Sequence, residues 1–294
     1  MNMKKELKNK QELVEKVLKD FTEENGKPKS IFDSLNYSLF VGGKRIRPIL
    51  IMESCRCLGG KPEDVYPLMA AMEMIHTYSL IHDDLPCMDD DELRRGKPTN
   101  HVVYGEATAL LAGDSLLNLA YETMLKGAEG RDNLAAYIKA VEVIAESAGV
   151  HGMIAGQVAD MESEGKEPDG EILDFIHDNK TGAILRASVI SGAMVAGAEG
   201  ETLECLKRYA RAIGLMFQVV DDILDVVSDS ETLGKNVGMD AERNKMTYPY
   251  VYGLDQSYKK VDELLKEALD SLSGFGEEAA FLRNLAVYLA DRKN

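Results

Sequence analysis

The sequence predicts an all-α protein, a large helical bundle that forms a single domain over residues 1–294. Three observations support this fold class. Apolar residues recur with a helical period along the chain, strand-like alternation is scarce, and Gly- and Pro-rich groups fall where helices should stop. No linker-like composition break or internal repeat divides the chain. The interior of such a bundle can hold a cavity lined by side chains from facing helices.

The expected helices follow in chain order. Residues 1–21 form an amphipathic helix and lack the uninterrupted apolar core of a signal peptide. Apolar stripes that advance by threes and fours predict helices over 65–83 and 209–224, and the same pattern returns at 264–269. Residues 163–170 read as a surface loop between two helices. We expect about ten helices with short connections.

Composition excludes several classes of partner. The chain has 294 residues, of which 45% are hydrophobic and 29% are charged, which is ordinary for a globular protein. A net charge of −16 argues against binding to nucleic acid or to an anionic membrane. No run of ~20 apolar residues suits a membrane-spanning helix. The four cysteines lack C-x-x-C or zinc spacing, so we expect reduced cysteines that serve in packing, in a cytoplasmic protein.

Two acidic clusters are the main functional signal. Residues 83–91 read DDLPCMDDD and residues 221–225 read DDILD, and each cluster follows an apolar helical run. Two like charges ~4 Å apart repel by roughly 4 kcal/mol at an effective dielectric constant near 20, so such crowding calls for bound cations. Oxygen ligands suit Mg²⁺, which keeps several waters and bridges to substrate phosphates. The sequence therefore predicts a magnesium–diphosphate enzyme with two facing groups of metal ligands.

The two clusters differ in how far their spacing can be interpreted. Asp221, Asp222 and Asp225 lie at i, i+1 and i+4, on one edge of a helix. In the first cluster, Pro86 kinks or ends the helix. The spacing leaves open which later aspartate completes the first site with Asp83 and Asp84: Asp89, Asp90 or Asp91.

Basic residues accompany both clusters. Arg94 and Arg95 follow the first cluster. One guanidinium group can bind two phosphate oxygens at once. The segment 42–48 (GGKRIRP) begins with two glycines that let backbone approach an anion, and it places Lys44 and Arg47 at i,i+3. Its spacing is not that of a Walker loop.

Further polar residues interrupt helical stretches that otherwise look buried: His76, Gln157, Lys180, Thr181 and Gln218. A buried ammonium group is costly when unpaired, so Lys180 needs an anionic ligand or an aspartate nearby. Lys235 and Lys245 lie in the stretch after the second cluster, which we expect to close over phosphate and exclude water.

Taken together, these motifs resemble the trans-type (all-E) short-chain prenyl diphosphate synthases, and most closely the bacterial farnesyl diphosphate synthases. The matching segments run over nearly the whole chain: 42–48, 76–86, 93–101, 156–157, 180–182, 217–225 and 245–249. The two aspartate motifs, in this order and with these flanks, are highly specific.

The resemblance implies a helical bundle of the isoprenoid synthase type, usually a homodimer, with three Mg²⁺ ions and a central active-site cavity. The implied metal ligands are Asp83, Asp84, Asp89 and Asp221, with Asp222 and Asp225 in support. The residues implied for the allylic diphosphate are Arg94, Lys180, Lys235 and Lys245. Those implied for isopentenyl diphosphate are Lys44, Arg47, His76 and Arg95. The Lys180–Thr181 segment and Gln218 would present oxygen dipoles to the carbocation.

The implied reaction is ionisation, condensation and elimination, which joins isopentenyl diphosphate to dimethylallyl or geranyl diphosphate and gives farnesyl diphosphate. In related enzymes the residues five and four positions before the first aspartate, here Tyr78 and Ser79, lie under the growing chain. An aromatic residue at the fifth position resembles the bacterial farnesyl enzymes, whereas plant-type geranylgeranyl enzymes carry a small or flexible residue there. A geranylgeranyl or geranyl diphosphate synthase is the alternative.

Three more distant alternatives fit less well. A terpene cyclase also ionises an allylic diphosphate, but it would not need the second cationic pocket. Some relatives of prenyltransferases are non-catalytic subunits, and the intact aspartates argue against that role here. An acidic Ca²⁺-binding protein would be expected to carry an EF-hand loop, which the sequence lacks.

Overall fold

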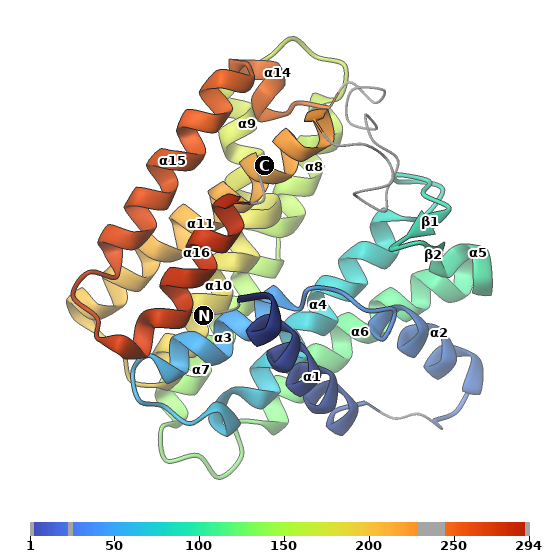
Figure 1. Ribbon diagram of the computed structural model, residues 1–294. Helices are drawn as coiled ribbons and strands as arrows, with labels where there is room; N and C mark the ends of the chain where they lie inside the picture. Colours follow the sequence, from blue (N-terminus) through green and yellow to red (C-terminus); the bar gives the residue numbers. More distant parts are fainter. Residues whose placement is uncertain (1–2, 23–25, 228–244, 292–294) are drawn as a thin grey trace. The chain divides into compact units, whose positions relative to one another are not determined.

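The computed structural model describes residues 3–22, 26–227 and 245–291 (Figure 1). Helices make up nearly all of its regular structure, which confirms the predicted all-α class. The chain forms two compact units, here called unit 1 (Met1–Ile49 and Glu63–Leu134) and unit 2 (Leu50–Pro62 and Ala135–Asn294). The single domain expected over residues 1–294 stays a prediction.

Unit 1 is built around α4 (Tyr66–Asp83), which packs along α6 (Glu106–Lys126). Its other elements are α1 (Met3–Asp20), α2 (Lys29–Leu39), the hairpin of β1 (Leu93–Arg94) and β2 (Lys97–Pro98), and α5 (Asn100–Tyr104). The short 3-10 turn Pro62–Val65 precedes α4, and α3 (Ile46–Arg56) runs from unit 1 into unit 2.

The sequence explains both ends of α4. Pro67 lies in its first turn, where the missing N–H costs nothing. The helix ends at Asp83, three residues before Pro86, as that proline predicts. Between them the helix is buried on nearly every side, including Met69, Met72 and Ile75. The buried helix α4 therefore places the start of the first acidic cluster at its C-terminal end.

Unit 2 is centred on α11 (Gly200–Val227), which packs against α10 (Gly182–Val195) and α15 (Leu254–Ser271). Its other elements are α7 (Leu134–Ala148), α8 (Met153–Ser163), α9 (Gly170–Ile176), α14 (Tyr248–Tyr252), the 3-10 turn Glu277–Ala279 and α16 (Ala280–Asp291). The predicted loop over 163–170 is confirmed, and Asp169 caps α9 by accepting from the backbone N–H of Glu171 at 2.8 Å.

A π-helical turn (His177–Thr181) joins α9 directly to α10. Such a turn inserts one residue into a helix and is often found at functional sites. This turn packs on both α8 and α11. Helical periodicity alone did not predict this irregularity.

Two further outcomes concern the sequence predictions. One of the Gly- and Pro-rich groups that we expected to end helices, Gly96–Pro98, forms part of the β1–β2 hairpin instead. The first helix ends at Asp20, so Phe21 lies just beyond it and is only half-buried. Among the described residues, none of the helices combines the length and apolar character that a membrane span requires.

Candidate active site

The first acidic cluster folds back on itself after α4. The backbone N–H of Asp89 donates to the carbonyl oxygen of Asp83 at 2.8 Å, and that of Asp90 donates to Leu85 at 3.2 Å. Asp90 takes a left-handed backbone with φ of 52°. Of the three aspartates that the spacing left open, the backbone thus brings Asp89 against Asp83.

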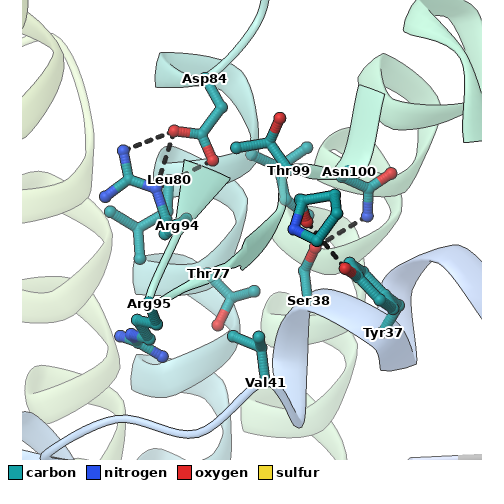
Figure 2. A pocket seen from close by; sticks show the side chains of 12 residues that line it. Tyr37, Ser38, Val41, Thr77, Leu80, Asp84, Arg94, Arg95, Thr99 and Asn100 are labelled. Atoms are coloured by element: carbon teal, nitrogen blue, oxygen red, sulfur yellow. Dashed lines mark hydrogen bonds and ion pairs between the residues drawn. The ribbon is translucent and has the colours of Figure 1, made fainter. Parts of the chain in front are cut away.

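Asp84 is buried and pairs with an arginine of the hairpin. Its carboxylate is 4% exposed and accepts from Arg94 Nε at 2.7 Å and from Arg94 Nη2 at 2.5 Å (Figure 2). Burial raises the pKa of Asp84, and the guanidinium of Arg94 opposes that rise. Asp84 therefore holds Arg94 in place within unit 1, in the arrangement of a bidentate pair.

The β1–β2 hairpin sends its two arginines to different partners. Arg95 and Gly96 form its tight turn, with φ of 54° and 74°. Arg94 reaches Asp84, while the guanidinium of Arg95 lies over the backbone of Gly43. A Cβ added at Gly43 would lie 2.6 Å from Arg95 Nη1, so a larger residue would displace this guanidinium. The φ of 143° at Gly43 also favours glycine.

A cationic group surrounds His76 in unit 1. The Nε atom of Arg47 is buried without a hydrogen-bond partner. Burial lowers the pKa of Arg47 to about 10, and the charge of Arg95 contributes in the same direction. Burial also lowers the pKa of His76 well below its ordinary value, with Arg47 and Arg95 adding to the shift. The structure thus brings Arg47, His76 and Arg95 into one electrostatically coupled group, and an anion would stabilise it.

Lys44 belongs to the same sequence segment but not to a helix. It lies exposed in the loop before α3, where its carbonyl oxygen accepts from Gln11 at 3.0 Å. The sequence prediction overlooked Arg45, which is 3% exposed and bonds to Glu73 at 2.5 Å and to Glu15 at 2.8 Å. Its partners lie far away in sequence, so no local signal distinguishes it from Lys44 and Arg47.

A pocket in unit 1 adjoins both arginines of the hairpin (Figure 2). It is formed by side chains from α2, α4 and the hairpin region: Tyr37, Ser38, Val41, Thr77, Leu80, Ile81, Asp84, Arg94, Arg95, Pro98, Thr99 and Asn100. Polar groups anchor its wall, since Tyr37 donates to the carbonyl oxygen of Pro98 at 2.7 Å.

The residues proposed to limit chain length lie one turn before Asp83 on α4. Tyr78 is 6% exposed, and its ring meets His82 edge to face at a centroid distance of 5.6 Å. Burial raises the pKa of Tyr78 to about 12. Ser79 is half-buried and donates to the carbonyl oxygen of His76 at 2.9 Å. Tyr78 is therefore the bulky group of the two in the apolar interior.

The second acidic cluster lies on α11, as predicted. Asp222 is buried. Its carboxylate accepts from Gln218 Nε2 at 2.9 Å and from the backbone N–H of Tyr248 at 2.8 Å, and His177 Nε2 lies 3.2 Å from its Oδ2. Asp221 and Asp225 are half-buried. His177 was missed in the sequence prediction, although its position three residues before Lys180 was a usable signal.

The π turn also carries Lys180 and Thr181. Lys180 Nζ lies 2.5 Å from Asp160 Oδ2, and Lys245 Nζ lies 3.8 Å from the same oxygen. The prediction that Lys180 needs an anion nearby is thus confirmed, with Asp160 as the aspartate. Asp160 itself was missed, since its role depends on how α8 packs on the turn. Thr181 is half-buried, and Lys235 lies outside the described residues.

The fit of Mg²⁺ can be judged from these donors. Within the described residues, no three His, Cys, Asp or Glu side chains are gathered closely enough to hold a metal ion. Asp84 and Asp222 are buried with protein donors on their oxygens, an arrangement that suits supporting residues. Asp83, Asp89, Asp221 and Asp225 are half-buried carboxylates of the kind that suits Mg²⁺. The donor set therefore fits magnesium chemically, and the individual ligand assignments stay predictions.

Comparison with known proteins agrees with this geometry. Residues 28–282 match the polyprenyl synthetase family model. The chain is 47% identical over 291 residues to the heterodimeric geranylgeranyl pyrophosphate synthase large subunit 1 of Arabidopsis thaliana, covering 97% of this chain and 78% of that protein. It is 47% identical over 272 residues to the geranylgeranyl diphosphate synthase of Cyanophora paradoxa, covering 92% and 90%.

Solved structures show the same fold. A crystal structure of an FPP/GFPP synthase from Zymomonas mobilis superposes with a TM-score of 0.87 at 32% identity and covers 98% of this chain and 99% of that one. A geranyltransferase from Legionella pneumophila gives 0.86 at 33% identity and covers 99% and 97%. The chain therefore has the isoprenoid synthase fold and is a prenyltransferase: it belongs to the polyprenyl synthetase family of trans-type prenyl diphosphate synthases.

Proposed function

We propose that the enzyme elongates an allylic diphosphate with isopentenyl diphosphate in a Mg²⁺-dependent reaction. One observation carries this proposal: Arg47 has a buried Nε without a partner and is coupled to His76 and Arg95. A buried guanidinium with an unsatisfied donor is costly unless an anion completes it. The diphosphate of isopentenyl diphosphate supplies such an anion, with Lys44 reaching it from the exposed loop.

The allylic substrate takes a second set of cations in this proposal: Arg94, Lys180, Lys235 and Lys245. Bound Mg²⁺ would neutralise the departing diphosphate, with Asp83, Asp89 and Asp221 as ligands and Asp222 and Asp225 in support. The resemblance also counts Asp84 among the ligands, and we place it in the supporting group because its carboxylate is paired with Arg94. Arg94 is already oriented by Asp84. Cations that are already in position stabilise the negative charge that develops on the diphosphate as the C–O bond breaks.

The remaining steps need no side-chain nucleophile. The allylic C–O bond ionises, and the electron pair leaves with the diphosphate. The Lys180–Thr181 segment and Gln218 face the carbocation with oxygen dipoles, and the double bond of isopentenyl diphosphate attacks it. The condensed cation then loses a proton to the departed diphosphate, and this loss forms the new double bond.

The names of the relatives favour geranylgeranyl diphosphate as the final product, so we take it as the first candidate in place of farnesyl diphosphate. Both curated relatives described above carry that name and match more than nine-tenths of this chain. On this count they support the alternative of the sequence prediction better than its main reading.

Farnesyl diphosphate is the second candidate, because one observation favours it. Tyr78 places a buried phenol ring five residues before Asp83, where a bulky group would shorten the space for a growing chain. The solved relative from Zymomonas mobilis, an FPP/GFPP synthase, is 32% identical.

One assay tests the proposal and separates the two products. The enzyme is incubated with Mg²⁺, isopentenyl diphosphate and, in turn, dimethylallyl, geranyl and farnesyl diphosphate, and the products are sized by chromatography. Elongation of farnesyl diphosphate supports the geranylgeranyl product, whereas accumulation of farnesyl diphosphate supports the second candidate. Absence of diphosphate release with every starter would contradict the proposed function.

Assembly and location complete the proposal. We propose a homodimer in the cytoplasm. Light scattering on the purified chain measures its oligomeric state.

A further inference from the structure

Two carboxylates of unit 2 each join the π turn to the segment Lys245–Tyr248. Asp222 accepts from the backbone N–H of Tyr248 at 2.8 Å, and its Oδ2 lies 3.2 Å from His177 Nε2 of the turn. Asp160 lies 2.5 Å from Lys180 of the same turn and 3.8 Å from Lys245. Asp222 belongs to the second acidic cluster, but Asp160 belongs to neither cluster and has no role in the reaction as proposed so far.

The position of Asp160 is fixed by close backbone packing. Asp160 follows Gly156 by one turn of α8, so the two residues share a face of that helix. A Cβ added at Gly156 would lie 2.1 Å from the backbone nitrogen of Lys180. The backbones of α8 and the π turn therefore touch at this glycine, and α8 holds Asp160 at a set distance from the turn.

The side chain of Asp160 is 9% exposed and carries one negative charge between two ammonium groups. A lysine is a compact charge on a flexible stem, so its position depends on the partner that fixes it. A carboxylate that sits nearly buried on a rigid helix can fix two such charges at once.

We propose that Asp160 is a positioning residue for the diphosphate group of the allylic substrate. It holds the ammonium groups of Lys180 and Lys245 at one place, so that an arriving diphosphate meets two preplaced cations. This inference rests on the proposed function, which assigns both lysines to that diphosphate. It adds the residue that organises them.

A contrary role predicts the opposite sign. A carboxylate that acted only through its negative charge would repel the diphosphate, and its removal would tighten binding. A positioning carboxylate, by contrast, leaves the lysines less ordered when it is removed, and binding weakens. The direction of the change therefore decides between the two roles.

The test replaces Asp160 by asparagine, which keeps the shape and removes the charge. Inorganic pyrophosphate is titrated into each protein by calorimetry, with and without Mg²⁺. We expect Asp160→Asn to raise the dissociation constant about tenfold, the loss of roughly one charge-assisted contact. In steady-state assays the KM for the allylic diphosphate should rise, while the KM for isopentenyl diphosphate stays unchanged. Equal or tighter binding of pyrophosphate would overturn the proposal.

Asp178→Asn is the matched control. Asp178 lies on the same π turn, where its carboxylate pairs with Arg186 at 3.1 Å instead of with a lysine of the site. This variant should bind pyrophosphate as the wild type does. If Asp178→Asn lost as much pyrophosphate affinity as Asp160→Asn, any change of charge near the turn would have the same effect. That result would exclude a specific role for Asp160.

A second pair of variants separates positioning from general damage to the fold. In a Lys245→Ala background, Asp160→Asn should cost clearly less affinity than it does alone, because one of its two cations is already absent. The same loss in both backgrounds would point to a structural role and overturn the proposal. If Asp160→Asn does not fold, Asp160→Glu keeps the charge but displaces it, and it should weaken pyrophosphate binding. Unchanged affinity in that variant would overturn the proposal as well.

The experiment distinguishes this inference from the proposed function. A wild-type protein that forms no elongated product but loses pyrophosphate affinity with Asp160→Asn would refute the function alone. A wild-type protein that elongates its substrate, with Asp160→Asn binding pyrophosphate normally, would refute the inference alone.

Discussion

Arg47 shows how burial acts on the charge of a single residue. Burial lowers its pKa from 12.5 to about 10, which leaves it charged at neutral pH. A lysine at the same place starts from an ordinary pKa of about 10.4, so the same burial would bring it to roughly 8. The choice of arginine therefore protects the charge across the physiological range.

This difference gives a prediction about pH. In Arg47→Lys the KM for isopentenyl diphosphate should match the wild type most closely near pH 6.5 and rise as the pH passes roughly 8, where the lysine loses its proton. The wild-type KM should not show that rise before pH 9. Steady-state kinetics over this pH range measures both. Parallel pH profiles for the two proteins would show that Arg47 does not bind the substrate through its charge.

A second prediction concerns Tyr78. Replacing this buried phenol by alanine opens space in unit 1, and we expect Tyr78→Ala to lengthen the longest product by at least one isoprene unit. Chromatography of the products measures the change. Tyr288→Ala, at a half-buried tyrosine of α16, is the control and should leave product length as it was. Identical products from wild type and Tyr78→Ala would remove Tyr78 from this role.

The partners of two buried or half-buried cations show what can be predicted from the sequence at the residue scale. The cost of burying an unpaired ammonium group predicted an anionic ligand or an aspartate beside Lys180, and the structure places Asp160 there. Which aspartate it would be depended on the packing of α8, which no local pattern encodes. For the same reason Arg45 was missed, since its partner Glu73 lies 28 residues away.

At the scale of elements, several candidate functional groups lie where regular structure is interrupted. The first cluster begins at the last residue of α4, Arg95 occupies a hairpin turn, and Lys180 lies on a π turn. Periodicity predicted the long helices on either side because their buried faces repeat. It missed the hairpin, whose strands are two residues each, and the π turn, which shifts the repeat by a single residue.

Close packing at one glycine yields a prediction for an element. Gly156→Ala places a Cβ within 2.1 Å of the backbone nitrogen of Lys180, so α8 and the π turn must separate. We expect a loss of about 1–3 kcal/mol in the free energy of unfolding and a higher KM for the allylic diphosphate. Denaturant unfolding and steady-state kinetics measure the two effects.

Gly274→Ala is the control for this prediction. A Cβ at Gly274 meets no atom within 4 Å, so stability and KM should stay near their wild-type values. If Gly156→Ala is as stable and as active as Gly274→Ala, the close contact between α8 and the π turn is not required.

At the scale of the whole molecule, composition and periodicity were sufficient to predict the fold class. In an all-α chain the buried face of each helix shows in the sequence as a repeat of apolar residues. The division into two compact units was not predicted. Its boundaries at residues 49/50, 62/63 and 134/135 fall at no linker-like sequence, and the first lies inside α3. Long-range packing defines these units, and a single sequence does not display it.

Removal of metal should separate the reaction from the fold. The described core is built from apolar side chains and internal ion pairs, so chelation with EDTA should abolish product formation while the circular dichroism spectrum and the melting temperature stay nearly unchanged. Added Mg²⁺ should restore activity. Unfolding on chelation would show instead that the metal has a structural role, and full activity in EDTA would exclude the metal from the reaction.

The π turn has a consequence for how this chain can change in length. A helix advances by about 100° per residue, so the one extra residue of a π turn sets the rotation of everything that follows. Deleting Asn179 would let α9 and α10 join as a regular helix, which local propensity would favour. That shorter chain would still satisfy the hydrophobic pattern of each helix, yet Lys180 and His177 could no longer meet Asp160 and Asp222 together. The turn therefore makes residue number, as well as residue type, a requirement of the site.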